Sequence, residues 1–228
     1  MVERTQEAQA EGDHIGCRKV LVLQRPGNLH NKIAELLHVK GHNVICYMSA
    51  GSWEKWRPDA STFPKSVLGK RLAGWPGEKW LDIRQTDILG PIMTARLDLC
   101  KQKGFDGVEP DNVDGYANNS GFPLTYNDQI NYNKFLAEEA HKRGLSVGLK
   151  NDLDQVNDLL PHFDWALNEQ CFQYKECDKL VPFISAGKLV FQVEYKLKPA
   201  QFCPAANNMN FNSMKKHLKL DAWQMPCW

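Results

Sequence analysis

Residues 104–116 read GFDGVEPDNVDGY, and this stretch decides the fold. It begins as an apolar strand and then carries Glu109, Asp111, Asn112 and Asp114 in quick succession. Because a strand alternates its faces, Glu109 and Asp111 are expected to point the same way. Two carboxylates on one face repel each other and are costly to bury together, which favours chemistry or cation binding. The alternative is that the strand ends here in a polar loop, and that its Asp and Asn residues cap the next helix.

The sequence around this stretch repeats a strand followed by a helix. Strands are expected at 19–23, 43–48, 105–108, 146–149, 163–167 and 188–193, and helices at 29–40, 88–103, 128–143, 153–160, 176–186 and 214–218. A long connection at 57–84, rich in Pro, Gly and Trp, is expected to be a functional loop or an insertion that covers one end of the fold. Residues 1–16 are expected to be a disordered tail, followed by a single domain over 17–228.

The alternation of strands and helices predicts an α/β fold with a parallel sheet. Polar or ionisable residues follow successive strands, in LKND at 149–152, LNEQ at 167–170 and VEY at 193–195. Such strand ends carry the active sites of TIM barrels and of open α/β sheets. No Gly-rich phosphate-binding motif follows the first strand, which disfavours a nucleotide-binding sheet. We therefore expect a (β/α)8 TIM barrel.

The composition indicates a globular protein that binds neither nucleic acid nor a membrane surface. The chain has 228 residues, 43% of them hydrophobic, and a formal net charge of +1. No apolar run reaches the roughly 18 residues of a membrane helix. Seven Trp and six Tyr could stack on sugars or could simply fill the core. We expect a monomer.

The seven cysteines allow disulfide bonds. The disulfide candidates are Cys171, Cys177, Cys203 and Cys227, which would imply an oxidising compartment. Cys46 and Cys100 fall in apolar stretches and are expected to be buried thiols. Cys17 is unassigned. The first 16 residues carry no apolar segment typical of a signal peptide.

The residues at the expected strand ends are carboxylates, amides, tyrosines and one lysine, without a histidine. They are Tyr47, Ser49, Glu109, Asp111, Asn112, Lys150, Asn151, Asp152, Glu169, Glu194 and Tyr195. The lack of histidine disfavours a Ser-His-Asp or Cys-His hydrolase. Paired carboxylates suit glycoside hydrolysis, in which one protonates the leaving oxygen and the other acts as base or nucleophile. A divalent cation is the weaker hypothesis because Lys150 would oppose it. No metal-binding motif is present, and no cofactor is expected.

Five motifs in this order resemble the endo-α-1,4-polygalactosaminidase family, glycoside hydrolase family 114. They are SAGSWEKWRPD at 49–59, GFDGVEPDNVDGY at 104–116, GLKNDLDQV at 148–156, NEQCFQYKEC at 168–177 and VEY at 193–195. The resemblance runs from about residue 43 to 227. It implies a (β/α)8 barrel, often secreted or extracellular, that cleaves galactosamine-rich exopolysaccharide.

The resemblance places the catalytic pair on Asp111 and Glu169. We hypothesise that Glu169 is the general acid and Asp111 the nucleophile or base. The other strand-end residues, Tyr47, Ser49, Glu109, Asn112, Lys150, Asn151, Asp152, Glu194 and Tyr195, would bind the substrate. A polymer with free amines is cationic, and an acidic rim of Glu109, Asp114, Asp152 and Glu194 would attract it. A retaining and an inverting course both remain open; the separation of the two carboxylates distinguishes them.

The chain departs from the family at its N-terminus. The family supplies two strands before the strand at 43–48, whereas here only KVLVL at 19–23 precedes it. The barrel is therefore expected to be incomplete or atypical there. This departure keeps a second function open, a catalytically inactive carbohydrate-binding homologue. An aldolase-like barrel with Lys150 as a Schiff-base amine is a weaker third possibility.

Overall fold

The fold is built on one curved sheet of mostly parallel strands. The computed structural model describes residues 5–8, 19–23 and 30–227. Its main sheet has nine strands in the order β1-β2-β3-β7-β8-β9-β10-β11-β12. The seven strands from β2 to β11 in this order pair in parallel, while β1 and β12 pair antiparallel at the two edges. The predicted α/β class and parallel sheet are confirmed.

The strands of the main sheet are β1 Thr5–Ala8, β2 Lys19–Leu23, β3 His42–Ser49, β7 Gly107–Asp111, β8 Ser146–Lys150, β9 Trp165–Glu169, β10 Leu189–Glu194, β11 Asn212–Lys216 and β12 Gln224–Pro226. The helices are α1 His30–Val39, α2 Thr86–Gln102, α3 Tyr126–Lys142, α4 Val156–Leu159, α5 Cys171–Tyr174, α6 Val181–Ser185 and α7 Pro199–Asn208. Short 3-10 turns cover Ala60–Thr62, Lys65–Val67, Gly115–Ala117, Leu153–Gln155 and Cys177–Leu180. None of the helices in the described ranges is long and apolar enough to cross a membrane.

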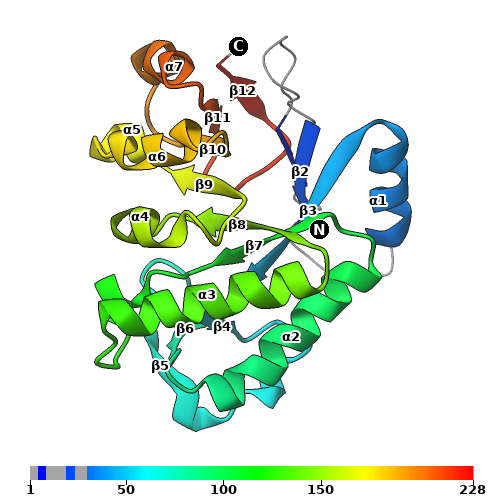
Figure 1. Ribbon diagram of the computed structural model, residues 1–228, viewed down its shortest axis with the longest axis vertical. Helices are drawn as coiled ribbons and strands as arrows, with labels where there is room; N and C mark the ends of the chain where they lie inside the picture. Colours follow the sequence, from blue (N-terminus) through cyan, green and yellow to red (C-terminus); the bar gives the residue numbers. More distant parts are fainter. Residues whose placement is uncertain (1–4, 9–18, 24–29, 228) are drawn as a thin grey trace.

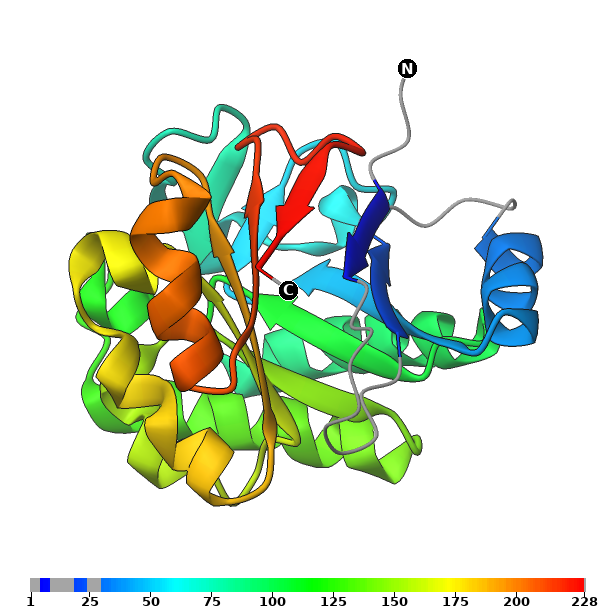
Figure 2. The ribbon, with the colours of Figure 1, turned by 90° about the horizontal axis from the view of Figure 1, so that it is seen from above.

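The sheet curves without closing. Figures 1 and 2 show β12 coming round to the side where β1 and β2 lie, with α2 to α7 on the outer side of the curve. Among the described strands, no pairing joins β12 to β1. The architecture is therefore that of an incomplete TIM-like barrel.

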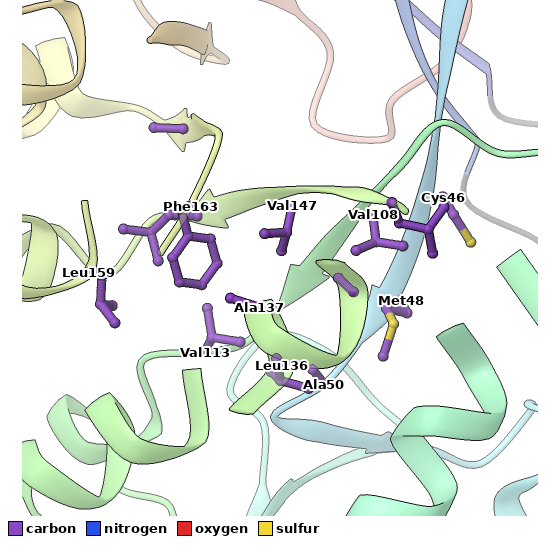
Figure 3. Packing of buried hydrophobic residues seen from close by; sticks show 14 of the residues in the cluster. Cys46, Met48, Ala50, Val108, Val113, Leu136, Ala137, Val147, Leu159 and Phe163 are labelled. Carbon is purple, nitrogen blue, oxygen red and sulfur yellow. The ribbon is translucent and has the colours of Figure 1, made fainter. Parts of the chain in front are cut away.

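The main core lies between the sheet and the outer helices. Val108 of β7 and Val147 of β8 are fully buried there against Leu136 and Ala137 of α3, as Figure 3 shows. A smaller cluster on the opposite face of the sheet is centred on Ile45 of β3 and Trp165 of β9. The strand alternation thus assigns one face to packing against the helices and the other to the concave side of the sheet, and active sites lie at the carboxyl ends of such strands.

The connection at 57–84 contains strands that the sequence analysis did not predict. It joins the preceding residues in a second, antiparallel sheet of order β4-β6-β5, formed by β4 Ser52–Glu54, β5 Leu68–Arg71 and β6 Glu78–Leu81. This sheet lies beyond the C-terminal ends of β3 and β7 (Figure 1). Its short strands carry many charged residues, so period-two hydrophobicity does not reveal them.

The C-terminal region also differs from the prediction. The expected helix at 214–218 overlaps strand β11, and α7 occupies a segment that the sequence analysis left unassigned. Pro199 fits the first turn of α7, whereas Pro204 lies inside the helix and masks it in the sequence. The expected tail at 1–16 falls largely outside the described residues; within it, Thr5–Ala8 forms β1 and pairs with β2.

Three disulfide bonds link the described cysteines. Cys171–Cys177 and Cys203–Cys227 join the cysteines that the sequence offered as candidates. The expectation of free thiols at Cys46 and Cys100 is wrong, because these residues form the third bond, with their Cα atoms 6.0 Å apart. The bond ties β3 to α2, which packs on the outer face of that strand. Cys17 lies outside the described residues.

Removing the bond between Cys46 and Cys100 should cost more stability than removing the bond between Cys171 and Cys177. The first closes a loop of 54 residues and the second a loop of 6. A longer loop restricts the unfolded chain more, by about 4 kcal/mol against about 2 kcal/mol in the chain-entropy model. We expect the two double alanine variants to differ by about 2 kcal/mol in their free energy of unfolding. Equilibrium urea denaturation measures both, and equal losses would contradict the prediction.

Candidate active site

The carboxyl ends of several parallel strands meet around one cavity of about 490 Å³. Tyr47 comes from β3, Asp111 from β7, Lys150 from β8 and Glu169 from β9, and all four side chains line it. Asn112 and Asn151, which directly follow their strands, line it as well. The structure thus brings together most of the strand-end residues that the sequence singled out.

Asp111 is held from two sides. The hydroxyl of Tyr47 donates to Asp111 Oδ2 at 2.9 Å, and the backbone N–H of Asn112 donates to Oδ1 at 2.8 Å. The backbone carbonyl of Asp111 accepts from the N–H groups of Ala50 and Gly51. Gly51 is required there, because a Cβ on it would lie 1.7 Å from the carbonyl oxygen of Asn112. These bonds fix the Asp111 carboxylate at the cavity wall.

Glu169 is oriented by two other predicted residues. The hydroxyl of Tyr195 donates a short hydrogen bond to Glu169 Oε1. The side-chain oxygen of Asn151 accepts from the backbone N–H of Glu169 at 2.9 Å, while its amide nitrogen lies 3.4 Å from Glu169 Oε2. Burial, together with the Glu169 carboxylate, raises the pKa of Tyr195, so its hydroxyl stays a donor. Tyr195 and Asn151 therefore set the rotamer of Glu169.

Lys150 stands between the two carboxylates. Its Nζ lies 2.5 Å from Glu109 Oε1, 3.8 Å from Glu169 Oε2 and 4.0 Å from Asp111 Oδ1. Burial by itself lowers the pKa of Lys150, but the carboxylates of Asp111, Glu109 and Glu169 hold it well above its ordinary value. A permanently protonated amine is no nucleophile, which counts against the Schiff-base hypothesis. Glu109 is fully buried beneath Lys150 and anchors it.

Residues with a left-handed backbone conformation directly follow strands β7, β8 and β9. They are Asn112 with φ 61°, Asn151 with φ 51°, Asp152 with φ 46° and Gln170 with φ 67°. Non-glycine residues rarely adopt this conformation, and each instance costs on the order of 1–3 kcal/mol, less for Asn and Asp. Such strain clusters at functional sites because it turns the chain sharply and leaves the preceding side chain facing the cavity.

A second hollow of about 330 Å³ continues the cavity past Glu169. Asp114, Asn151 and Glu169 line both, so the two form one cleft. Asp152 lies here, 5% exposed; one oxygen accepts from Asn133 at 2.9 Å, and the other, Oδ1, has no hydrogen-bond partner in the described part of the chain. Burial, aided by the carboxylates of Asp114 and Asp154, raises the pKa of Asp152 to about 8.

Four predicted substrate-binding residues do not line the cleft: Glu109 and Tyr195, which contact Lys150 and Glu169 as described above, and Glu194 and Ser49. Glu194 is fully buried and accepts from the backbone N–H groups of Phe172 and Gln173 at the start of α5, so it stabilises that turn. Ser49 is also fully buried; its hydroxyl bonds to Ser52 and accepts from the side chain of Asn112. Glu194 therefore has a structural role, and Ser49 acts only through Asn112. The sequence could not separate the two faces at these strand ends.

The sequence analysis missed the residues that the second sheet contributes to the cavity. Glu54, Trp56, Arg57, Trp75, Glu78 and Trp80 line it from this sheet and its turns. The high density of Trp between 53 and 80 was the available signal. Leu220, near the C-terminus, also reaches the cavity. The carboxylates that line the whole cleft outnumber its basic groups, which are Arg57, Lys150 and Lys179.

Another hollow, of about 400 Å³, lies on the outer side of β3 beneath α2 and is mainly apolar. Neither Asp111 nor Glu169 reaches it, so we assign function to the acidic cleft instead. Within the described ranges, no group of three or more His, Cys, Asp or Glu side chains is arranged to hold a metal ion.

Comparisons with known proteins agree with this geometry. The profile of glycoside-hydrolase family GH114 matches residues 13–228. The structure of Aspergillus fumigatus Ega3 in complex with galactosamine is 38% identical, with a TM-score of 0.85 over 96% of this chain and 91% of that chain. The glycoside hydrolase domain of PelA from Pseudomonas aeruginosa shares the fold at 11% identity, with a TM-score of 0.66 over 90% of this chain and 96% of that chain. A comparison with curated proteins gives no match.

Replacing Asp152 by Asn should stabilise the fold at alkaline pH and leave it nearly unchanged at acid pH. The pKa of Asp152 is about 8 when folded and 3.8 ordinarily, so the free energy of unfolding falls as the pH rises between these values. An amide avoids the buried charge and can still accept from Asn133. We expect a gain on the order of a few kcal/mol at pH 8.5 and little at pH 4.

Urea denaturation of wild type and Asp152→Asn at both pH values measures this effect. Glu138→Gln is the matched control, because Glu138 is an exposed carboxylate on α3 that lies outside the cleft lining. Its stability should change little at either pH. A loss of stability in Asp152→Asn at pH 8.5 would show that the buried charge is compensated.

Proposed function

The chain belongs to glycoside-hydrolase family GH114, and from this premise we propose that it hydrolyses α-1,4 linkages in a galactosamine-containing polysaccharide. Asp111 and Glu169 would be the catalytic pair. The observation that carries this proposal is the position of Lys150, which lies within 4.0 Å of an oxygen of each carboxylate. Two carboxyl groups that lie near one ammonium and line one cleft support the paired-carboxyl chemistry of a glycosidase.

In this proposal Glu169 donates a proton to the leaving oxygen, and Asp111 acts as nucleophile or as base toward water. Hydrogen bonds from Tyr47 and Asn112 orient Asp111, while Tyr195 and Asn151 orient Glu169. Lys150 offsets part of the repulsion between Asp111 and the carboxylate that Glu169 becomes once its proton has left. The side chains beside the pair contribute by position rather than by taking part in bond making.

The acidic cleft supports a cationic substrate. Asp114, Asp152, Asp154 and Glu176 line its second hollow, where Lys179 is the basic residue. A polymer with protonated amines would be attracted to such a groove, and its ammonium groups would pair with the desolvated carboxylates there. Ega3, which is 38% identical to this chain, was crystallised with galactosamine. The cleft continues on both sides of the carboxylate pair, and this continuity favours cleavage within a chain.

The pair is tested by hydrolysis of a partially deacetylated α-1,4-galactosaminogalactan. We expect Asp111→Asn and Glu169→Gln each to lower kcat by at least about 10³-fold, because each removes a group that acts only in the transition state. Glu138→Gln, a change of an exposed carboxylate on α3 outside the cleft lining, should retain activity within a few fold. Circular dichroism confirms folding of each variant. An active Asp111→Asn or Glu169→Gln enzyme would remove that residue from the pair.

The open sheet favours one competing function, a carbohydrate-binding protein without activity. A barrel that lacks part of its wall can hold a sugar while it fails to hold the transition state. Folded wild-type protein that binds the polymer and releases no oligosaccharide would establish this alternative. In an active enzyme, the anomeric configuration of the first product, followed by NMR, separates the two roles of Asp111: retention identifies a nucleophile and inversion a base toward water.

A further inference from the structure

The second sheet builds one end of the cleft next to Asp111. Trp56, Trp75 and Glu78 line the same cavity as Asp111 but sit on the turns and on strand β6 of that sheet. The catalytic scheme above uses none of the three. Their exposure, packing and charge environment indicate what this end of the cleft binds.

The two tryptophans present apolar surface inside a polar cleft. Trp56 is 47% exposed and Trp75 is 46% exposed, although both are large apolar side chains. Gly77, with φ 97°, packs closely against one of them: a Cβ on it would come 2.9 Å from Trp56 Cζ3. The glycine thus lets the indole of Trp56 lie on the backbone and limits its movement. A fixed, exposed indole in a cleft suits the apolar face of a sugar ring, because it adds contact area with little loss of side-chain entropy.

Glu78 supplies negative charge at this end. It is only 6% exposed, and its Oε2 accepts from the hydroxyl of Ser52 at 2.8 Å. The neighbouring Glu54 differs, because Arg57 pairs with both of its oxygens, at 2.5 and 3.1 Å. No basic side chain within the described ranges forms an ion pair with Glu78. Glu78 is therefore the carboxylate of this sheet that is available to pair with a cationic group of a ligand.

The environment of Glu78 disfavours its charge in the free protein. Burial raises the pKa of Glu78 to about 7, and the carboxylates of Glu54 and Asp111 add to this, while Ser52 and Arg57 oppose it. A cation that enters the cavity would relieve this cost. A neutral group would not, because it would exclude water from the carboxylate without replacing the lost charge interaction.

We propose that Trp56, Trp75 and Glu78 form a subsite for one hexosamine residue with a free amine, the ring lying on the indoles and the ammonium meeting Glu78. This inference rests on the proposed function, and it assigns to Glu78 the discrimination between a free and an acetylated amine. An N-acetyl group has no charge and more bulk, so it would leave the buried carboxylate unpaired. Sites of this kind discriminate by orders of magnitude because the wrong ligand leaves a polar group unsatisfied.

Binding to a protein without turnover tests the subsite. Calorimetric titration of Glu169→Gln with an α-1,4-linked galactosamine oligomer and with its N-acetylated counterpart gives both affinities. Adding Glu78→Gln, which keeps an acceptor for Ser52, should lower the affinity for the amine oligomer at least about 10-fold. The affinity for the acetylated oligomer should stay unchanged or rise. Adding Trp75→Ala instead should weaken both oligomers, because it removes contact with the ring rather than charge.

Matched controls are Glu35→Gln, an exposed carboxylate on α1, and Trp223→Ala, an exposed indole that stacks on His217 and lies outside the cleft lining. Neither should change either affinity. If Glu78→Gln lowered the affinity for both oligomers equally, or for neither, the subsite would be overturned even if wild type hydrolyses the polymer. Selective loss in Glu78→Gln together with an inactive wild type would keep the subsite and reject the proposed activity. Circular dichroism and the urea midpoint of each variant show that any loss is local.

Discussion

The rest of the site depends on the buried ammonium of Lys150. Strand β8 lies between β7 and β9, so its last side chain is within reach of the carboxylates that end both neighbours. Glu109, one pleat below Asp111 on β7, holds the ammonium at 2.5 Å. Removing one partner of such a buried pair leaves an uncompensated charge and commonly costs about 3–5 kcal/mol. Lys150 therefore couples the stability of the sheet to the placement of the two carboxylates.

This charge cluster is combined with strained backbone at the same strand ends. Asn112, Asn151, Asp152 and Gln170 adopt left-handed conformations directly after the residues that face the cavity. Local hydrogen bonds offset the strain: the side chain of Asn112 reaches Ser49 and Ser52, and Asn151 accepts from the backbone of Glu169. Short polar side chains both tolerate the conformation and make these bonds, which explains the Asn-rich strand ends.

Sequence patterns sufficed for the parallel sheet and for the residues that follow its strands. They worked because strand and helix periods are local properties, as in β7 with its Glu109 and Asp111. They failed for features that are set by contacts between residues far apart in the sequence. Cys46 and Cys100 become neighbours only because α2 packs on β3, and Glu194 faces the helices because its strand orientation is set by tertiary contacts.

The second sheet was also not predictable from local sequence patterns. Its strand β6 carries Glu78 and Lys79 beside Trp80 and Leu81, a pattern that has no clear period. The strand exists because β4 and β5 pair with it on either side, and because Gly77 provides the turn before it. Its contribution to the cavity was hidden for the same reason, although the Trp content of 53–80 marked the region as unusual.

The open sheet changes what must hold the fold together. In a closed barrel every strand has two neighbours, whereas here β1 and β12 end the pairing within the described part of the chain. Two disulfides act near these ends: Cys46–Cys100 ties β3, two strands from one edge, to α2, and Cys203–Cys227 ties α7 to the residue that follows β12. The central strands β7, β8 and β9, which carry Asp111, Lys150 and Glu169, pair on both sides and need no such link for their alignment. The middle of the sheet can thus keep the geometry of the proposed catalytic pair, while covalent bonds restrain the two ends of the described sheet.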